Sequence, residues 1–328
     1  MKHQRRSFRH LAAAAAIVTA LSAFAGDRDA LAQSRQTVRI VVPTPPAGVN
    51  DLMARLLTEY IGRVHGLSTV VENRPGAAEA IGTESVARAA PDGNTLLFAS
   101  SQIVINPHLR KLNYHPLESF EPICQLVVAP AVISVNATSA YRNLKDLLDA
   151  ARAKPGSVNM ASIGPGTPFD IGLAVLKRAA GADITFVPFN GNGPSINALL
   201  GDHVTSSFNS YSSAAEQIKA GKMRPLAVAM PSRIEPLPQV PTVAESGYPG
   251  YEVTIEFGVY APANTPKDIA AQFARWFSEA LQAPEIKAKL AAQELYPVGI
   301  CGAEFSTHLR KEYEKYGRAI REANFKVE

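Results

Sequence analysis

The sequence predicts an α/β fold, because short apolar and β-branched runs alternate with stretches of helical periodicity along most of the chain. Residues 38–42 (VRIVV) form the kind of run that lies buried in a parallel sheet. The Pro/Gly cluster at 43–48 follows, and neither a helix nor a central strand can contain it. A helix with its apolar residues on one face then begins near Asn50 or Asp51, either of which can serve as N-cap.

The same order of strand, Gly/Pro-rich loop and helix recurs to the end of the chain. Further strands are expected at 69–71, 95–99, 158–162, 184–187, 204–208, 226–230 and 251–260. Further helices are expected at 77–90, 169–180, 195–200, 214–219, 266–282, 284–292 and 303–323. The length of 328 residues suggests two domains, and no repeat of solenoid period is present.

The first 32 residues have the pattern of a secretory signal peptide. Residues 1–10 are basic, residues 11–25 are small or apolar, and small residues at two sites predict cleavage after Ala25 or Ala32. A disordered N-terminus is the alternative. Arg5-Arg6 resembles a twin-arginine signal, so the Sec and twin-arginine routes both stay open. Either route predicts a soluble periplasmic protein.

Charge and composition exclude several classes of protein. With 46% apolar and 19% charged residues, the chain is not expected to be disordered. The net charge is +4, and the leader, with five basic and two acidic residues, accounts for most of it. Because the rest of the chain has no clustered basic patch, we expect no nucleic-acid partner.

The sequence lacks the common catalytic and cofactor motifs. It has no H-E-x-x-H pair, no G-x-S-x-G elbow and no G-x-x-x-x-G-K-[ST] phosphate loop. The G-x-G sequences at 164–166 and 191–193 lack the third glycine of the dinucleotide fingerprint. We therefore expect no catalytic residue, no metal, no cofactor and no enzymatic activity.

The two cysteines, Cys124 and Cys301, permit one disulfide in an oxidising compartment. The sequence cannot show whether they lie close enough to bond, and cysteine is often simply a small buried residue. Both interpretations stay open.

Three Gly/Pro-rich loops lead from a strand into a helix, at 43–51, 162–169 and 188–195. A helix N-terminus offers free main-chain N–H groups, and glycine lets a ligand approach them. Such loops bind small anions, typically carboxylates, and hydroxyl and amide residues lie beside these three: Ser162, Thr167, Asn190 and Ser195. The alternative is that each loop needs Gly and Pro only in order to turn.

Seven sequence blocks, in order, resemble the substrate-binding receptors of tripartite tricarboxylate transporters, also called Bug receptors. They are P-T-P-P-A-G-V-N-D-L-M-A-R at 43–55, E-N-R-P-G-A at 72–77, P-D-G-N-T-L-L at 91–97, S-I-G-P-G-T-P at 162–168, V-P-F-N-G at 187–191, P-T-V-A-E-S-G-Y-P-G-Y at 241–251 and A-P-A-N-T-P at 261–266. The resemblance extends over residues 37–325.

The resemblance implies a two-lobed periplasmic binding protein of type II, a Venus flytrap in which each lobe has a mixed, mostly parallel sheet flanked by helices. We place lobe 1 at 33–130 plus 254–328 and lobe 2 at 131–253, with crossovers in the segments 122–135 and 251–260. The implied function is capture of a small carboxylate and its delivery to the membrane subunits of the transporter by a monomeric receptor. A receptor that serves a two-component sensor kinase is the first alternative, and an exported α/β enzyme is the second.

Similar receptors hold a ligand carboxylate on the amides of the first loop and complete the site from the second lobe. Carried over to this chain, the ligand-binding residues are Thr44, Pro46, Ala47, Gly48, Asn50, Asp51, Ser100, Ser101, Ser162, Gly166, Thr167, Asn190, Gly191 and Asn209.

Several positions depart from the family pattern. Thr44 replaces Phe, Ala47 replaces Gly, Ala78-Glu79 replace a glycine pair, Asp170 replaces a frequent His, Asn190 replaces Lys, and Glu256 replaces a frequent Trp. If Asp170 or Glu256 lines the pocket, its charge disfavours a second carboxylate and favours a hydroxyl or ammonium group. Alternatively, both are solvated surface acids. We therefore expect a monocarboxylate or a zwitterion rather than a tricarboxylate, with the ligand's identity left open.

Overall fold

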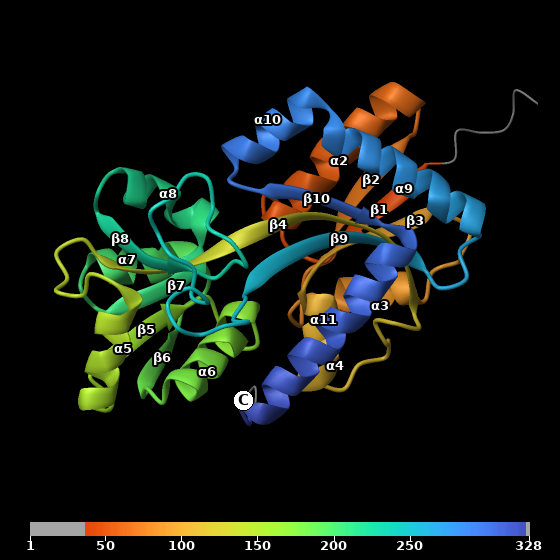
Figure 1. Ribbon diagram of the computed structural model, residues 1–328. Coiled ribbons are helices and arrows are strands. Elements are labelled where there is room, and N and C mark those ends of the chain that lie inside the picture. The colour runs from red at the N-terminus through yellow and green to blue at the C-terminus, as the bar shows by residue number, and fades with distance from the viewer. Residues whose placement is uncertain (1–36, 326–328) are drawn as a thin grey trace, which may run out of the picture. The chain divides into compact units, whose positions relative to one another are not determined.

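Three apolar runs near the start of the chain form neighbouring parallel strands in the computed structural model, which describes residues 37–325 (Figure 1). β1 (Val38–Val42) lies between β2 (Thr69–Asn73) and β3 (Thr95–Ser100) and pairs with both. Their carboxyl ends therefore share one edge of the sheet. The predicted signal peptide, residues 1–32, lies outside the described residues.

Two long strands continue this sheet in the antiparallel direction. β9 (Thr254–Pro262) pairs with β3 on one side and with β4 (Phe120–Asn136) on the other. β10 (Tyr296–Cys301) is also antiparallel to β4. The sheet is therefore mixed, as the sequence predicts, and its two longest strands run antiparallel to their neighbours.

β4 changes partners along its length. Its register with β9 ends at the pair Pro130–Thr254, and from Ala131 onward it pairs with β7 (Ser206–Ser210) and, from Val132, with β8 (Met223–Val228). Parallel strands β5 (Val158–Ser162) and β6 (Ile184–Pro188) extend the sheet beyond β7. The strand order is β2-β1-β3-β9-β4-β7-β5-β6.

Ten helices of the described chain cover the strands. They are α2 (Val49–His65), α3 (Ala80–Ala87), α4 (Gln102–Leu109), α5 (Leu144–Ala153), α6 (Pro168–Ala180), α7 (Asn192–Leu200), α8 (Tyr211–Lys219), α9 (Lys267–Gln282), α10 (Pro284–Ala292) and α11 (Gly302–Glu322). Across residues 37–325, no helix combines the length and the apolar character that crossing a bilayer requires.

Alternating strand residues supply the cores on the two faces of the sheet. In β1, Ile40 belongs to a core cluster with residues of α2, α9 and α10, whereas Val41 belongs to another with residues of α3, α4 and α11. Around β5, Met160 packs with α5 and α6, and Ala161 packs with α7 and α8. Burial of a large apolar side chain contributes roughly 1.5–3 kcal/mol, so these faces fix which side of each strand turns inward.

The strand and helix expectations are largely confirmed, with differences at specific places. The helix expected at 77–90 is shorter, because Ala77, Ala78 and Glu79 have left-handed backbone (φ +48°, +50° and +76°). The strand expected at 251–260 begins only at Thr254. α4, α5 and β10 were not predicted.

Cys124 and Cys301 form a disulfide, which settles the alternative that the sequence left open. The two residues lie opposite each other in the register of β4 and β10, with Cα atoms 4.0 Å apart. The bond therefore joins an edge strand to the long strand β4 across 177 residues of chain.

Candidate functional site

The loop from β1 to α2 carries the first group of predicted ligand residues. Pro46 and Ala47 are exposed, and Gly48 is the N-cap of α2 with extended backbone. Because glycine has no side chain, nothing at the N-cap position accepts a hydrogen bond from the first turn of the helix. Thr44 is half-buried, and its main-chain oxygen accepts a 3.1 Å hydrogen bond from the Asn73 side chain.

Asp51 braces this loop from inside the helix. Its carboxylate accepts hydrogen bonds from the Ala47 N–H and from Asn73 Nδ2, both at 3.0 Å, and it pairs with Arg55 at 2.9 Å. The hydrogen bond with the Arg55 guanidinium lowers the pKa of Asp51, and this effect outweighs burial. Asp51 therefore stays ionised and holds the loop in shape.

α6 begins with the same brace and, in addition, a capped N-terminus. The Gly166 N–H donates to Asp170 at 2.9 Å, while the N-cap Thr167 accepts from the Asp170 N–H. Burial raises the pKa of Asp170 to about 6, and its side chain is enclosed rather than solvated, which corrects the surface-acid alternative. α5 has both features as well, through Asn143 and Asp146. Of these three braced helices, only α2 lacks a side-chain acceptor at its N-cap.

The third loop ends at Gly191, the N-cap of α7, whose φ of +102° favours glycine. Asn190 beside it is exposed. Asn209 lies underneath, fully buried, and donates to Asn192 Oδ1 at 3.2 Å and to Ser195 Oγ at 3.0 Å. Asn209 therefore supports the start of α7, and its side chain is enclosed.

Two serines lie at the end of β3, at the edge where β1 and β2 also end: Ser100 is the last residue of the strand, and Ser101 follows it. The Ser100 hydroxyl donates to Glu79 at 2.6 Å, and the Ser101 hydroxyl accepts from the Glu256 N–H at 2.9 Å. Glu79 is not among the residues that the sequence predicts to bind the ligand, although it stands where the family pattern has a glycine.

The structure thus divides the predicted site residues into two groups. Accessible or partly accessible residues are Thr44, Pro46, Ala47, Gly48, Thr167, Asn190 and Gly191. Buried residues are Asn50, Asp51, Ser100, Ser101, Ser162, Gly166 and Asn209. The first group lies on the strand-to-helix loops, at the carboxyl ends of parallel strands, where α/β sheets bind ligands. In the second group, Asp51, Gly166 and Asn209 support those loops through their hydrogen bonds. Ser100 and Ser101 instead bond Glu79 and Glu256.

A family model described as "Tripartite tricarboxylate transporter family receptor" matches residues 53–325. The chain belongs to this receptor family. Protein BugT of Bordetella pertussis is 31% identical over 293 residues, which cover 88% of this receptor and 90% of BugT. These findings confirm the resemblance to Bug receptors.

Solved structures of periplasmic binding proteins share the fold of this receptor. The structure of periplasmic binding protein BugD is 29% identical, covers 89% of this receptor and 99% of BugD, and superposes with a TM-score of 0.75. Rpa4515 of R. palustris, solved with adipate, is 27% identical and has a TM-score of 0.78. The match covers 90% of this receptor and 99% of Rpa4515. The receptor therefore has the α/β fold of periplasmic binding proteins, as the sequence predicts.

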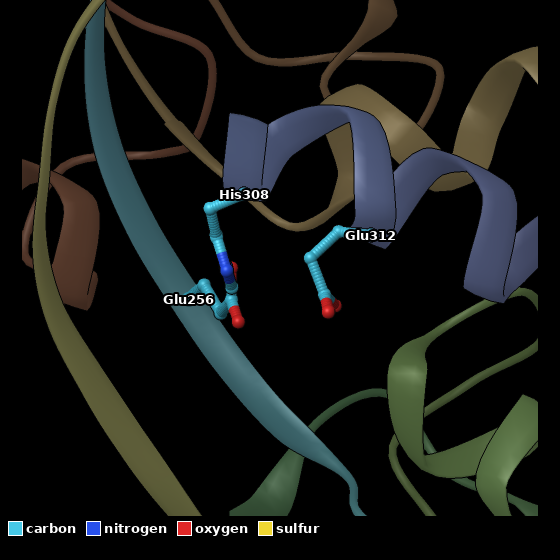
Figure 2. Close-up of side chains that lie close together, drawn as sticks. All are labelled: Glu256, His308 and Glu312. Carbon is cyan, nitrogen blue, oxygen red and sulfur yellow. The ribbon is translucent and has the colours of Figure 1, made fainter. Parts of the chain in front are cut away.

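A second polar cluster of the receptor joins β9 to α11 (Figure 2). His308 Nε2 lies 2.8 Å from Glu256 Oε2, and Lys315 pairs with Glu312 at 2.7 Å. The hydrogen bond with Glu256 raises the pKa of His308, and burial raises the pKa of Glu312. Glu256 is partly buried in this cluster, so it too is not the solvated surface acid that the sequence left open.

The cluster has the donor types of a metal site, since ligand atoms of Glu256, His308 and Glu312 lie within 4.8 Å of one another. However, Lys315 and the imidazole already supply positive charge to the two carboxylates. We therefore interpret the cluster as an ion-pair network that ties α11 to β9.

Proposed function

We propose that this receptor is a periplasmic solute-binding protein that captures a small carboxylate and delivers it to the membrane subunits of a tripartite tricarboxylate-type transporter. The observation that carries the proposal is the glycine N-cap of α2, in a loop that Asp51 holds in place. The first turn of α2 keeps main-chain N–H groups at the positive end of the helix dipole, which suits a carboxylate.

α7 is the second-lobe counterpart in this proposal. Its N-cap is Gly191, and the exposed amide of Asn190 lies beside it. α6 contributes less, because the Thr167 side chain already accepts a hydrogen bond from an amide of its first turn, that of Asp170. The ligand would therefore lie between the starts of α2 and α7, and closure of the lobes would exclude water from its hydrogen bonds.

The lobes are also a proposal. We infer that residues 33–130 plus 254–328 form lobe 1 and residues 131–253 form lobe 2. The last register pair of β4 with β9 is Pro130–Thr254, and β4 pairs with β7 from Ala131 onward, so the partner exchange falls at these boundaries. A monomer without catalytic activity, exported by a signal peptide, completes the proposal.

The test begins with a thermal-shift screen of carboxylic acids, since a ligand that binds the native state raises its melting temperature. Calorimetry with the best ligand then compares the wild type with Gly48→Val. A Cβ at Gly48 has Pro45 O at 3.6 Å and Thr44 Oγ1 at 3.8 Å as its nearest atoms, so the variant is expected to fold.

We expect Gly48→Val to lower affinity at least tenfold, because its side chain stands over the amides of α2. Ala271→Val, on the exposed face of α9, is the control for added bulk and should bind normally. Unchanged affinity in Gly48→Val would exclude α2 as the carboxylate site. Uptake of the identified ligand by cells that lack the receptor then tests delivery.

A further inference from the structure

Glu79 has a backbone conformation that suits glycine. It is the last of three consecutive residues in the left-handed region, with φ +76°, and it is the N-cap of α3. A non-glycine residue in this region costs roughly 1–2 kcal/mol. Such strain persists where the surrounding structure holds it, and it is concentrated at functional sites.

The Glu79 carboxylate points into the edge where β1, β2 and β3 end. It accepts a 2.6 Å hydrogen bond from Ser100 Oγ and a 3.2 Å hydrogen bond from the Ser100 N–H. Asn50 Nδ2, in the first turn of α2, lies 3.5 Å from the same carboxylate. Glu79 thus contacts two of the residues predicted to bind the ligand.

Within residues 37–325, the unpartnered polar atoms on the elements around this carboxylate include two acceptors and also the Tyr114 hydroxyl, which can donate or accept. Asn50 is 3% exposed, and its Oδ1 has no hydrogen-bond partner within the described chain. Gln102, which begins α4 directly after Ser100 and Ser101, also has a buried Oε1 without a partner there. A second carboxylate placed here would meet oxygen atoms and negative charge, whereas an ammonium or hydroxyl group would find acceptors.

We propose that Glu79 is a specificity-determining residue, which selects carboxylate ligands that carry an ammonium or hydroxyl donor and rejects matched dicarboxylates. The inference rests on the proposed function, because it concerns the same binding site. The donor would hydrogen-bond Glu79 and Asn50 Oδ1 while the ligand carboxylate binds the N-terminus of α2. Burial also raises the pKa of Glu79 to about 7, which agrees with a carboxylate that lacks a cationic partner.

The test uses calorimetry with two matched series of acids. One series is propionate, lactate, alanine and malonate, and the other is hexanoate, 6-hydroxyhexanoate, 6-aminohexanoate and adipate. The proteins are the wild type, Glu79→Gln, Glu79→Gly and Glu59→Gln. Glu59 is exposed on α2, so its variant controls for the loss of one negative charge. Glu79→Gly suits the positive φ and therefore keeps the test valid if Glu79→Gln folds poorly.

In at least one series, we expect the wild type to bind the amino or hydroxy acid at least tenfold more tightly than the dicarboxylate. Glu79→Gly should reduce that preference at least tenfold, and Glu59→Gln should retain it. If the wild type binds the dicarboxylate as tightly as the amino or hydroxy acid, the assignment of Glu79 is overturned. A preference that is unchanged in both Glu79 variants also overturns it. Neither result contradicts the proposal that the protein binds carboxylates. If no acid of either series or of the wider screen binds any variant, the proposed function falls, and this inference falls with it.

Discussion

Asp51 accepts a 3.0 Å hydrogen bond from the main-chain N–H of Ala47, four residues earlier in the chain. The same pairing joins Asp170 to Gly166 and Asp146 to Arg142. In each case an aspartate in the first helical turn fixes the residue that precedes the N-cap. In α2 this brace leaves the amides of the first turn free, because the N-cap is Gly48.

Removal of the brace should destabilise the protein and weaken ligand binding. Asp51→Ala loses hydrogen bonds from Ala47 and Asn73 and the ion pair with Arg55, and we expect a loss of about 2–3 kcal/mol in the free energy of unfolding. Urea denaturation measures this loss. Asp146→Ala is the matched control, because the same brace lies on α5, away from the proposed site. It should cost about 1 kcal/mol and leave carboxylate affinity unchanged. Equal effects of the two variants on affinity would contradict the role of Asp51.

Ala47 has a φ of +66°, which suits the glycine that the family pattern has at this position. Ala47→Gly relieves that strain, although it also raises the entropy of the unfolded chain. The net expectation is a gain of about 0.5–1 kcal/mol in the free energy of unfolding, measured by urea denaturation. Ala271→Gly, at an exposed position within α9, should instead lose about 1 kcal/mol. Losses of similar size in both variants would show that the loop carries no strain at Ala47.

Glu79 should make stability fall as the pH rises. Burial raises its pKa in the folded state from 4.5 to about 7, so between these pH values the unfolded chain has lost a proton that the folded protein retains. Stability therefore decreases through this window and is constant with respect to Glu79 above it. Tyr114 and Tyr260, which face Glu79, stay neutral because burial raises their pKa values well above this range.

Melting temperatures of the wild type and Glu79→Gln between pH 4 and pH 8.5 test this titration. The variant cannot ionise, so its advantage over the wild type should grow from pH 4.5 to pH 7 and then level off. The raised pKa values of Asp170 and His308 also make stability depend on pH, but they are present in both proteins and cancel in the difference between the two melting temperatures. A difference that does not change with pH would show that Glu79 titrates normally.

Elements that are specified by their own residues could be predicted from the sequence. β1 is an apolar run followed by a Pro/Gly cluster, and α2 has a clear apolar face, so both were predicted from local pattern. α5 is also specified by its own residues, since Asn143 precedes leucines at helical spacing, although it was not among the predicted helices. β10 contains Pro297 and Gly299, both unusual in strands, and its place depends on pairing with β4.

The candidate site was predictable to the level of loops but not of side chains. The glycines and prolines after each strand, together with the family pattern, indicate the three loops, because glycine and proline shape a loop through their own backbone. The contact of Glu79 with Ser100 spans 21 residues and depends on the alignment of β2 and β3 through β1. Likewise, the burial of Asn209 depends on the packing of α7 on β7. Local sequence carries no signal for such contacts.

Gly82 allows α3 to lie directly on the loop from β1 to α2. A Cβ at this position would come within 2.7 Å of Arg74 O and 2.8 Å of Pro43 Cα, which are main-chain atoms that cannot turn away. Gly82→Ala must therefore displace Pro43, where the loop to α2 begins, or α3, which Glu79 precedes. We expect a loss of about 1–3 kcal/mol in the free energy of unfolding and weaker carboxylate binding, measured by urea denaturation and calorimetry. Gly193→Ala, in α7, has no atom within 4 Å of the new Cβ and should gain up to about 1 kcal/mol from helix propensity. If Gly82→Ala is as stable as the wild type and binds as tightly, the close approach of α3 to Pro43 is not what positions the loop.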